Sequence, residues 1–352
     1  MVERDGLENR CGRKPTEGSN PSLSAMAAHF QISKVNAAGS GVDSAGDPTG
    51  LLPVIFFTGD FLPVIFLPVI FFCRCWPFWC FFNCDPPELA YSVGVVFLPS
   101  RTEVTMTRIS FQLYSVRNFD LPAILPQLAK IGLQEVEGYG GLYANIDNFQ
   151  KQLADSGLRM STGHFDLAML RDDPGEVIRI ASLMNMESVI IPFLTPEDRP
   201  TDFTGWQAFA ATLAEAGKPV IDAGLSFGWH NHAFEFTACE NGRYPIEAIM
   251  EASDHIGLEI DLAWVHVAGE DPVTWLETYA GRLLAAHVKD CAPDGECADE
   301  DGWADVGHGV MNWDKIVPAM RSAGAELMVL EHDNPSDAMR FATRSFTTAS
   351  AF

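Results

Sequence analysis

Basic residues are scarce in this sequence. Its 352 residues include 23 Lys and Arg against 47 Asp and Glu, which gives a formal net charge of −24 at pH 7. So acidic a chain is unsuited to nucleic acid, whose phosphates need Lys and Arg, and to anionic membrane surfaces. We therefore expect neither nucleic acid nor a membrane as a partner.

A hydrophobic run long enough to span a membrane is also missing. The longest apolar stretch, residues 61–73, has 13 residues and is interrupted by Pro63 and Pro68, whereas a spanning helix needs about 20 residues. It lies too far from Met1 to be a signal peptide. The nearby cysteines lack the paired spacing of a zinc knuckle: Cys73, Cys75, Cys80 and Cys84.

The composition changes at Met106. Residues 1–50 are polar and rich in Gly, Ser and Asn, which predicts disorder, and the hexamer Leu-Pro-Val-Ile-Phe-Phe occurs at both 52–57 and 67–72. We expect 1–105 to be a low-complexity leader, either disordered or an over-extended reading frame ahead of a natural start at Met106. Residues 106–352 hold 16 basic and 37 acidic residues and three scattered cysteines, which is typical of a reduced, cytoplasmic protein.

Short apolar runs alternate with amphipathic stretches after Met106, the pattern of a parallel sheet with helices between its strands. The predicted strands are 109–113, 133–137, 158–163, 187–192, 225–230, 256–261, 283–288 and 326–331. The predicted helices are 121–131, 145–156, 174–185, 204–223, 244–252, 272–280, 313–323 and 336–349. Eight such units in about 250 residues predict a (β/α)8 TIM barrel. A doubly wound sheet would carry a glycine-rich loop after its first strand, and residues 112–117 contain no glycine.

Glycine and proline mark the predicted helix boundaries. Gly132, Gly157, Gly224 and Gly324 each fall between a helix and the next strand, where a left-handed residue ends a helix. Asp-Pro at 173–174 and 271–272 and Asn-Pro at 334–335 place a capping residue before proline, which predicts helix starts there.

Polar residues gather at the carboxyl ends of the predicted strands, where TIM barrels carry their chemistry. In chain order these ends hold Gln112 and Tyr114, Glu137, His164, Pro192, His230 and His232, Asp261, His287 and Lys289, and Glu331. The last four strands thus end in His, Asp, His and Glu. Crowded carboxylates repel unless a cation neutralises them, and imidazoles with carboxylates suit Mn²⁺, Co²⁺, Zn²⁺ or Fe²⁺ better than Ca²⁺.

Several other residues near this rim have more than one interpretation. His230 and His232 point to the same side of their strand, so one is a metal ligand and the other is a candidate for substrate binding, whereas Asn231 points away and is structural. Glu235 either hydrogen-bonds an imidazole or faces solvent. Lys289 either holds a substrate oxyanion or pairs with Asp290. Trp264 and Trp303 are either stacking platforms for a sugar or packing residues.

Proton transfer needs a further group, and the candidates are Glu137, His164 and His232, with Glu331 as ligand and orienting group. The longest connection, residues 290–311, contains seven carboxylates. A loop of this length is typical of a lid, and its His308 is the residue expected to fold over a substrate.

Seven segments together resemble the sugar phosphate isomerase/epimerase family of the xylose isomerase-like superfamily. They are QLYSVR (112–117), VE (136–137), HNHAFEF (230–236), DLAWVHVAGEDP (261–272), HVKD (287–290), GHGVMNW (307–313) and LEHDNP (330–335). The resemblance covers 106–352 and none of 1–105. It implies a divalent metal, with Mg²⁺ added to the candidates, on His230 or His232, Asp261, His287 and Glu331.

The resemblance also implies a reaction class. A sugar isomerase or epimerase of this superfamily transfers a proton through a metal-stabilised enediolate, and its substrate is a small sugar or keto-sugar that Gln112, Tyr114, Trp264, Lys289 and His308 would contact. Ketose 3-epimerases carry a glutamate at the position of His230. The His-x-His of this sequence is more similar to the pattern of inosose dehydratase, so dehydration of a keto-sugar or keto-inositol is an alternative. A non-catalytic sugar-binding barrel is a third reading. Barrels of this size commonly self-associate, so a homo-oligomer is a state to test.

Overall fold

The computed structural model describes residues 108–352. The predictions made for residues 1–105 lie outside this range. Within it, no helix is both long and apolar enough to cross a bilayer.

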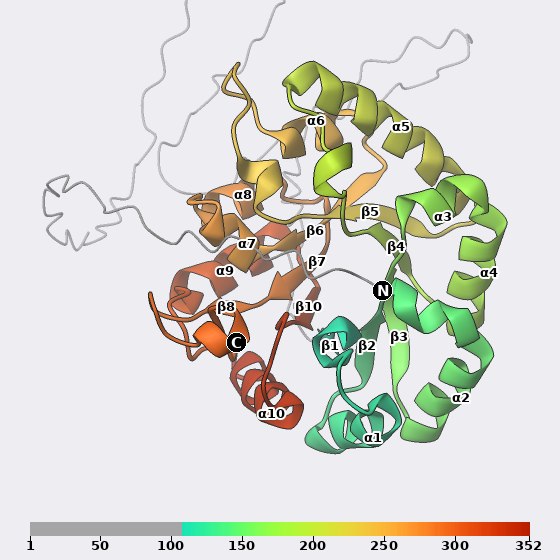
Figure 1. The fold of residues 1–352 in the computed structure, drawn as a ribbon, viewed down its shortest axis with the longest axis vertical. Coiled ribbons are helices and arrows are strands. Elements are labelled where there is room, and N and C mark those ends of the chain that lie inside the picture. The colour runs from blue at the N-terminus through green and yellow to red at the C-terminus, as the bar shows by residue number, and fades with distance from the viewer. Residues whose placement is uncertain (1–107) are drawn as a thin grey trace, which may run out of the picture. The chain divides into compact units, whose positions relative to one another are not determined.

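Eight parallel strands form the barrel seen at the centre of Figure 1. Their order is β1-β10-β7-β6-β5-β4-β3-β2. An isolated parallel bridge between Gln112, which follows β1, and Glu137 on β2 joins the two edges of this sheet. The strands are β1 (Arg108–Phe111), β2 (Glu135–Gly138), β3 (Arg159–His164), β4 (Ser188–Ile191), β5 (Ser226–His230), β6 (Ile256–Asp261), β7 (Leu283–Val288) and β10 (Leu327–Leu330). The predicted barrel is confirmed.

Helices surround the strands (Figure 1). Eight match the predicted segments: α1 (Leu121–Ile131), α2 (Ile146–Ser156), α4 (Pro174–Met184), α5 (Phe203–Asp222), α6 (Pro245–Glu251), α8 (Pro272–Thr278), α9 (Trp313–Ala323) and α10 (Ala338–Ala349). Gly132 ends α1 in the predicted left-handed conformation with φ 115°, and the Asp173 side chain accepts a hydrogen bond from Glu176 N at the start of α4. The apolar faces of these eight helices pack against the outer face of the sheet and complete the hydrophobic core there.

Several short elements were not predicted. They are α3 (Leu167–Asp172), α7 (Leu262–Val267), the antiparallel pair β8 (Asp290–Cys291) and β9 (Trp303–Ala304), and five 3₁₀ turns, η1 (Leu113–Val116), η2 (Gly140–Asn145), η3 (Pro196–Asp198), η4 (Phe234–Phe236) and η5 (Ala298–Glu300). The helix start predicted at Asn334-Pro335 is wrong. Asp337 caps α10 instead, accepting hydrogen bonds from Met339 N and Arg340 N.

The two ends of the barrel differ in chemistry. At the amino-terminal end, the Glu135 carboxylate on β2 accepts hydrogen bonds from Arg108, Arg159 and Ser161, so its charge is compensated by neighbours on β1 and β3. At the carboxyl-terminal end, buried imidazoles and carboxylates face one another. In TIM barrels the first end serves stability and the second serves function.

Candidate metal centre

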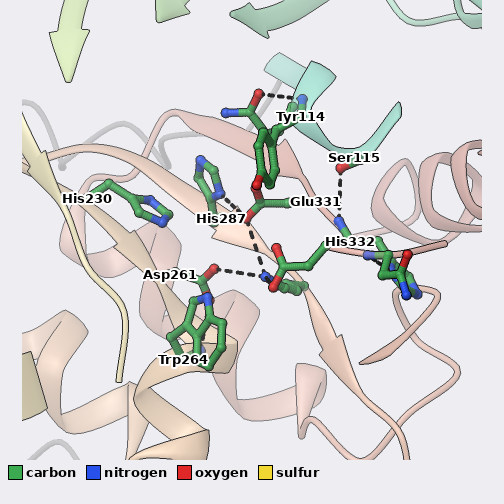
Figure 2. A network of polar contacts seen from close by, with 12 residues as sticks. Tyr114, Ser115, His230, Asp261, Trp264, His287, Glu331 and His332 are labelled. Atoms are coloured by element: carbon green, nitrogen blue, oxygen red, sulfur yellow. Dashed lines mark hydrogen bonds and ion pairs between the residues drawn. The ribbon is translucent and has the colours of Figure 1, made fainter. Parts of the chain in front are cut away.

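Four buried side chains from consecutive strands meet at the carboxyl-terminal end of the barrel. His230 ends β5, Asp261 ends β6, His287 lies on β7, and Glu331 follows β10. One ligand atom from each lies within 4.8 Å of the others, and Figure 2 shows these side chains turned toward a common space. We call this set the upper centre. It consists of the four residues that the sequence placed together at the ends of strands five to eight.

Backbone contacts hold Asp261 in place. The Asn231 side chain accepts a hydrogen bond from Asp261 N at 3.0 Å and donates one to Asp261 O at 3.2 Å, so Asn231 has the structural role expected from its direction. One oxygen of Asp261, Oδ1, caps α7 by accepting from Trp264 N at 2.9 Å. The other, Oδ2, is buried without a hydrogen-bond partner and remains available to a ligand.

A second group of polar side chains lies against the upper centre. His164 Nε2 is 2.6 Å from Glu259 Oε2 and 3.1 Å from Glu137 Oε1. His287 Nε2 is 2.8 Å from Glu137 Oε1 and 3.2 Å from Glu259 Oε2. The Gln112 amide donates to Glu137 at 2.7 Å and accepts from Tyr114 N. Gln112 is completely buried, and it links Glu137 to the backbone of the turn that carries Tyr114.

Glu259 is the residue that sequence reasoning missed. It lies on β6 two residues before Asp261, and it is completely buried. Side chains two apart on a strand share a face, so the pattern Glu-Ile-Asp at 259–261 already placed both carboxylates inside the barrel. The prediction considered strand ends alone and therefore passed over Glu259.

Burial and charge shift the pKa values of these groups in opposite directions. Burial opposes ionisation of Glu137, but the His164 and His287 imidazoles outweigh it and hold the pKa of this carboxyl well below its usual range. Burial likewise disfavours the charged form of His164, but Glu137 and Glu259 raise its pKa to about 10. Burial raises the pKa of Asp261 to about 7 against the attraction of Lys289. Burial and His287 hold the pKa of His230 well below its usual value.

Lys289 is a buried ammonium beside the upper centre. Its Nζ lies 2.6 Å from Asp333 Oδ2, 3.6 Å from Glu331 Oε2 and 4.0 Å from Asp261 Oδ2, and 4.1 Å from the centre of the Trp303 ring. The alternative of a salt bridge to Asp290 is wrong, because its partner is Asp333. Lys289 therefore already compensates part of the negative charge of the upper centre.

Aromatic rings and His232 line the approach to this centre. The His232 ring lies 5.2 Å from that of His230 and 5.3 Å from those of both Phe193 and Trp264. Burial and Lys289 lower the pKa of His232 to about 3, so the ring is neutral. Trp264 is half-buried and meets the buried Trp303 edge-on at 4.8 Å.

Glu235 takes neither of its predicted positions. It is buried, and it accepts hydrogen bonds from the Trp229 indole and from His232 N, both at 2.9 Å. Burial raises the pKa of Glu235 to about 8 despite these bonds. Glu235 therefore fixes the backbone that carries His232 and contacts no imidazole.

Asp290 anchors the long connection that was expected to form a lid. Its carboxylate accepts hydrogen bonds from Cys291 N, Gly307 N, Met311 N and the Trp313 indole, at 2.8–3.1 Å. His308 is exposed, and its backbone N donates to Asp305 O within the loop. The structure thus places the His308 side chain on the surface of the loop. Tyr114, also exposed, lies beside Tyr139 and Arg117.

Comparison with known proteins gives a family and a fold. The model of the family described as xylose isomerase-like TIM barrel matches residues 125–348, more than half of the chain. No protein of curated function matches the sequence. The structure is similar to a sugar phosphate isomerase/epimerase from Parabacteroides distasonis, with 21% identity, a TM-score of 0.59, and coverage of 69% of this chain and 93% of that one.

Two further structures have similar folds. One is the probable 3-DHS dehydratase AsbF from Bacillus anthracis, with 12% identity, a TM-score of 0.56, and coverage of 69% of this chain and 97% of that one. The other is the IOLI protein with a bound zinc atom, with 14% identity, a TM-score of 0.56, and coverage of 69% of this chain and 97% of that one. At identities this low, the likeness shows the fold and not the reaction.

The upper centre has the chemistry that a divalent cation requires. Two imidazoles and two carboxylates supply nitrogen and oxygen donors of the kinds that bind Zn²⁺, Mn²⁺ and related ions. Asp261 Oδ2 is buried and has no hydrogen-bond partner, although buried polar atoms normally have one. The donor set and this unpaired oxygen both fit a metal on these residues.

Proposed function

This chain belongs to the xylose isomerase-like TIM barrel family, and from that premise we propose that it is a divalent-metal-dependent sugar isomerase or epimerase. The observation that carries the proposal is the convergence of His230, Asp261, His287 and Glu331, with ligand atoms within 4.8 Å of one another, at the end of the barrel where the chemistry of this fold occurs. These four residues would hold the cation.

The cation would supply Lewis acidity toward adjacent carbonyl and hydroxyl oxygens of a sugar, which stabilises the charge of an enediolate. The protein must then provide three things. It has to orient the sugar, hold the ligands in place, and move one proton between two carbons or between the two faces of one carbon.

We propose His232 as the group that moves the proton. Three candidates were predicted, and two of them, Glu137 and His164, bond to each other and to other buried partners. His232 is partly exposed, and its Nδ1 has no hydrogen-bond partner. This nitrogen can therefore exchange a proton with a substrate bound beside the centre. Glu331 then serves as ligand and orienting group.

Substrate contacts follow from the residues around the mouth. We propose that Trp264 packs against the sugar ring, since its indole is half-buried beside His232. Lys289 would hold a substrate oxygen through an ammonium that Asp333 and Glu331 keep charged. Contacts of the substrate with the exposed side chains of Tyr114 and His308 are further predictions. A cytoplasmic location and self-association remain predictions.

Dehydration of a keto-sugar or keto-inositol is the second candidate function. It shares the first step, removal of a proton next to a carbonyl, but a hydroxyl then leaves as water. One observation favours it: the imidazole of His230 at the end of β5, where ketose 3-epimerases carry a glutamate.

Deuterium incorporation separates these functions. The full chain would be incubated in D₂O with Mn²⁺ and a panel of keto-sugars and keto-inositols, with and without a chelator, and analysed by mass spectrometry. An isomerase or epimerase adds deuterium to substrate and product without loss of water, and a dehydratase gives a product lighter by one water. Binding without exchange would identify a non-catalytic barrel, and turnover by metal-free protein would refute the proposed mechanism.

A further inference from the structure

An arginine without an ionic partner lies at the mouth of the barrel. Arg199 belongs to the connection that leaves the carboxyl end of β4 and leads to α5, and it is half-buried. We propose that Arg199 binds a carboxylate of the substrate, so that the substrate is an acidic keto-sugar rather than a neutral one. This assignment depends on the proposed function, since it assumes that the upper centre binds a keto-sugar.

The terminal nitrogens of Arg199 are free. Its Nε donates a hydrogen bond to Leu194 O at 2.9 Å, which fixes the side chain to its own turn. Within residues 108–352, Nη1 and Nη2 form no hydrogen bond, and no carboxylate lies within 4.0 Å of the guanidinium. Neither nitrogen is among the buried unpaired atoms. Both are therefore accessible to a ligand.

Other half-buried arginines of the described chain have partners for their terminal nitrogens. Arg117 and Arg282 donate from these nitrogens to backbone carbonyls. The rest form ion pairs with carboxylates: Arg108, Arg243 and Arg340. The sequence has twice as many acidic as basic residues, 47 against 23. A scarcity of carboxylates therefore does not explain why Arg199 has none.

The surroundings of Arg199 hold the guanidinium but do not neutralise it. Its central carbon lies 3.7 Å from the centre of the Phe234 ring and 5.2 Å from that of Phe193, which are distances of cation–π contact. Burial lowers the pKa of Arg199, and the attraction of Glu235 and Glu197 does not restore it. Partial burial of an unpaired charge is unfavourable, and a bound carboxylate would relieve this cost.

A short series of ring contacts connects Arg199 to the upper centre. The Phe193 ring, which is 43% exposed, lies 5.2 Å from the Arg199 guanidinium and 5.3 Å from the His232 ring. The His232 ring in turn lies 5.2 Å from that of His230. A keto-sugar with its carbonyl end at the upper centre would thus extend past His232, and its far end would meet Arg199.

The chemistry of this position favours a carboxylate over a phosphate. A planar guanidinium with free terminal nitrogens matches the two oxygens of a carboxylate in a bidentate pair. A phosphate dianion calls for additional cations, and two that lie on strand-end connections, Lys289 and Arg117, already contact Asp333. The exposed carboxylate of Glu197, two residues before Arg199, also disfavours a dianion.

Matched pairs of sugars test this assignment. D-Fructuronate and D-fructose differ only at carbon 6, which is a carboxylate in the first and a hydroxymethyl group in the second, and D-tagaturonate and D-tagatose differ in the same way. Binding of each to the full chain loaded with Mn²⁺ would be measured by isothermal titration calorimetry. We expect the acid of at least one pair to bind about 10–100-fold more tightly than its neutral partner.

Two variants of Arg199 connect this preference to the guanidinium. Arg199→Gln should reduce the ratio of the two affinities to about 1. Arg199→Lys keeps the charge but not the planar fork, so it should retain part of the preference. The matched control is Arg171→Gln, because Arg171 is an exposed arginine without an ion pair on α3, at the same end of the barrel, and this variant should keep the full preference.

Several results would overturn the assignment. They are a wild type that prefers the acid in neither pair, an acid preference that survives in Arg199→Gln, and tighter binding of D-fructose 6-phosphate than of D-fructuronate. Metal-dependent deuterium exchange on neutral sugars without an acid preference would reject the role of Arg199 and leave the proposed function standing. An acid preference that depends on Arg199, without exchange on any sugar, would instead support the carboxylate site and reject catalysis.

Discussion

We predict that the hydrogen bonds accepted by the Asp290 carboxylate stabilise the long connection after β7 (residues 290–311). Its carboxylate accepts four of them, two on Oδ1 from Cys291 N and Met311 N, and two on Oδ2 from Gly307 N and the Trp313 indole. In Asp290→Asn one oxygen becomes an NH₂ group that faces two donors. Hydrogen bonds to charged groups contribute about 1.5–3 kcal/mol each, so losing two lowers the free energy of unfolding by about 3–6 kcal/mol.

Urea unfolding followed by circular dichroism measures this loss as a lower midpoint at an unchanged slope. Asp294→Asn is the matched control, because Asp294 lies on the same loop and is exposed, and its effect should stay within about 0.5 kcal/mol. A loss below about 1 kcal/mol for Asp290→Asn would show that the loop does not depend on this carboxylate. It would also remove the physical reason why Gly307, Met311 and Trp313 gather around Asp290.

Three further predictions concern single side chains. His232→Asn should lower kcat for proton exchange by about 10²–10⁴-fold with bound metal unchanged, as measured by deuterium incorporation and metal analysis. Lys289→Met should destabilise the metal-free protein by about 3–5 kcal/mol, because Asp333 and Glu331 lose their buried partner, and added Co²⁺ should restore part of the melting temperature. For Glu300, burial opposes ionisation but hydrogen bonds from Arg340 and Ser336 lower its pKa from 4.5 to about 2, so up to about 3 kcal/mol of stability is present above pH 4.5 and lost as the pH falls toward 2. Arg340→Met should flatten that pH dependence in acid unfolding.

Local signals in the sequence predicted most of the fold. Alternating apolar runs, glycines after helices, and Asp-Pro pairs reflect contacts within a few residues, so they located all eight barrel strands and eight of the helices. The Asn334-Pro335 signal was misleading because a second capping residue, Asp337, follows three residues later and has its side chain on Met339 N and Arg340 N. The hairpin of β8 and β9 was missed because strands of two residues carry no periodicity.

Contacts between distant segments were harder to predict. The partner of Lys289 is an example, because Asp333 lies on another strand connection. The contacts of Glu235 are local, with Trp229 six residues and His232 N three residues before it. They were missed because the interpretation considered imidazole and solvent and did not consider an indole or a backbone N–H as the partner.

The register of the sheet explains why strand ends reveal the upper centre and hide Glu259. Strands of a closed barrel tilt, so the ends of neighbouring strands are staggered. His230, the last residue of β5, pairs with Glu259 and not with Asp261, whereas Asp261 pairs with His287 on β7. The imidazole of His230 on β5 thus lies level with the carboxylate of Glu259. The imidazole of His287 on β7 lies level with the carboxylate of Asp261. The strand β6 therefore carries two inward carboxylates, Glu259 beside His230 and Asp261 beside His287. Inspection of strand ends alone finds only the second of these carboxylates.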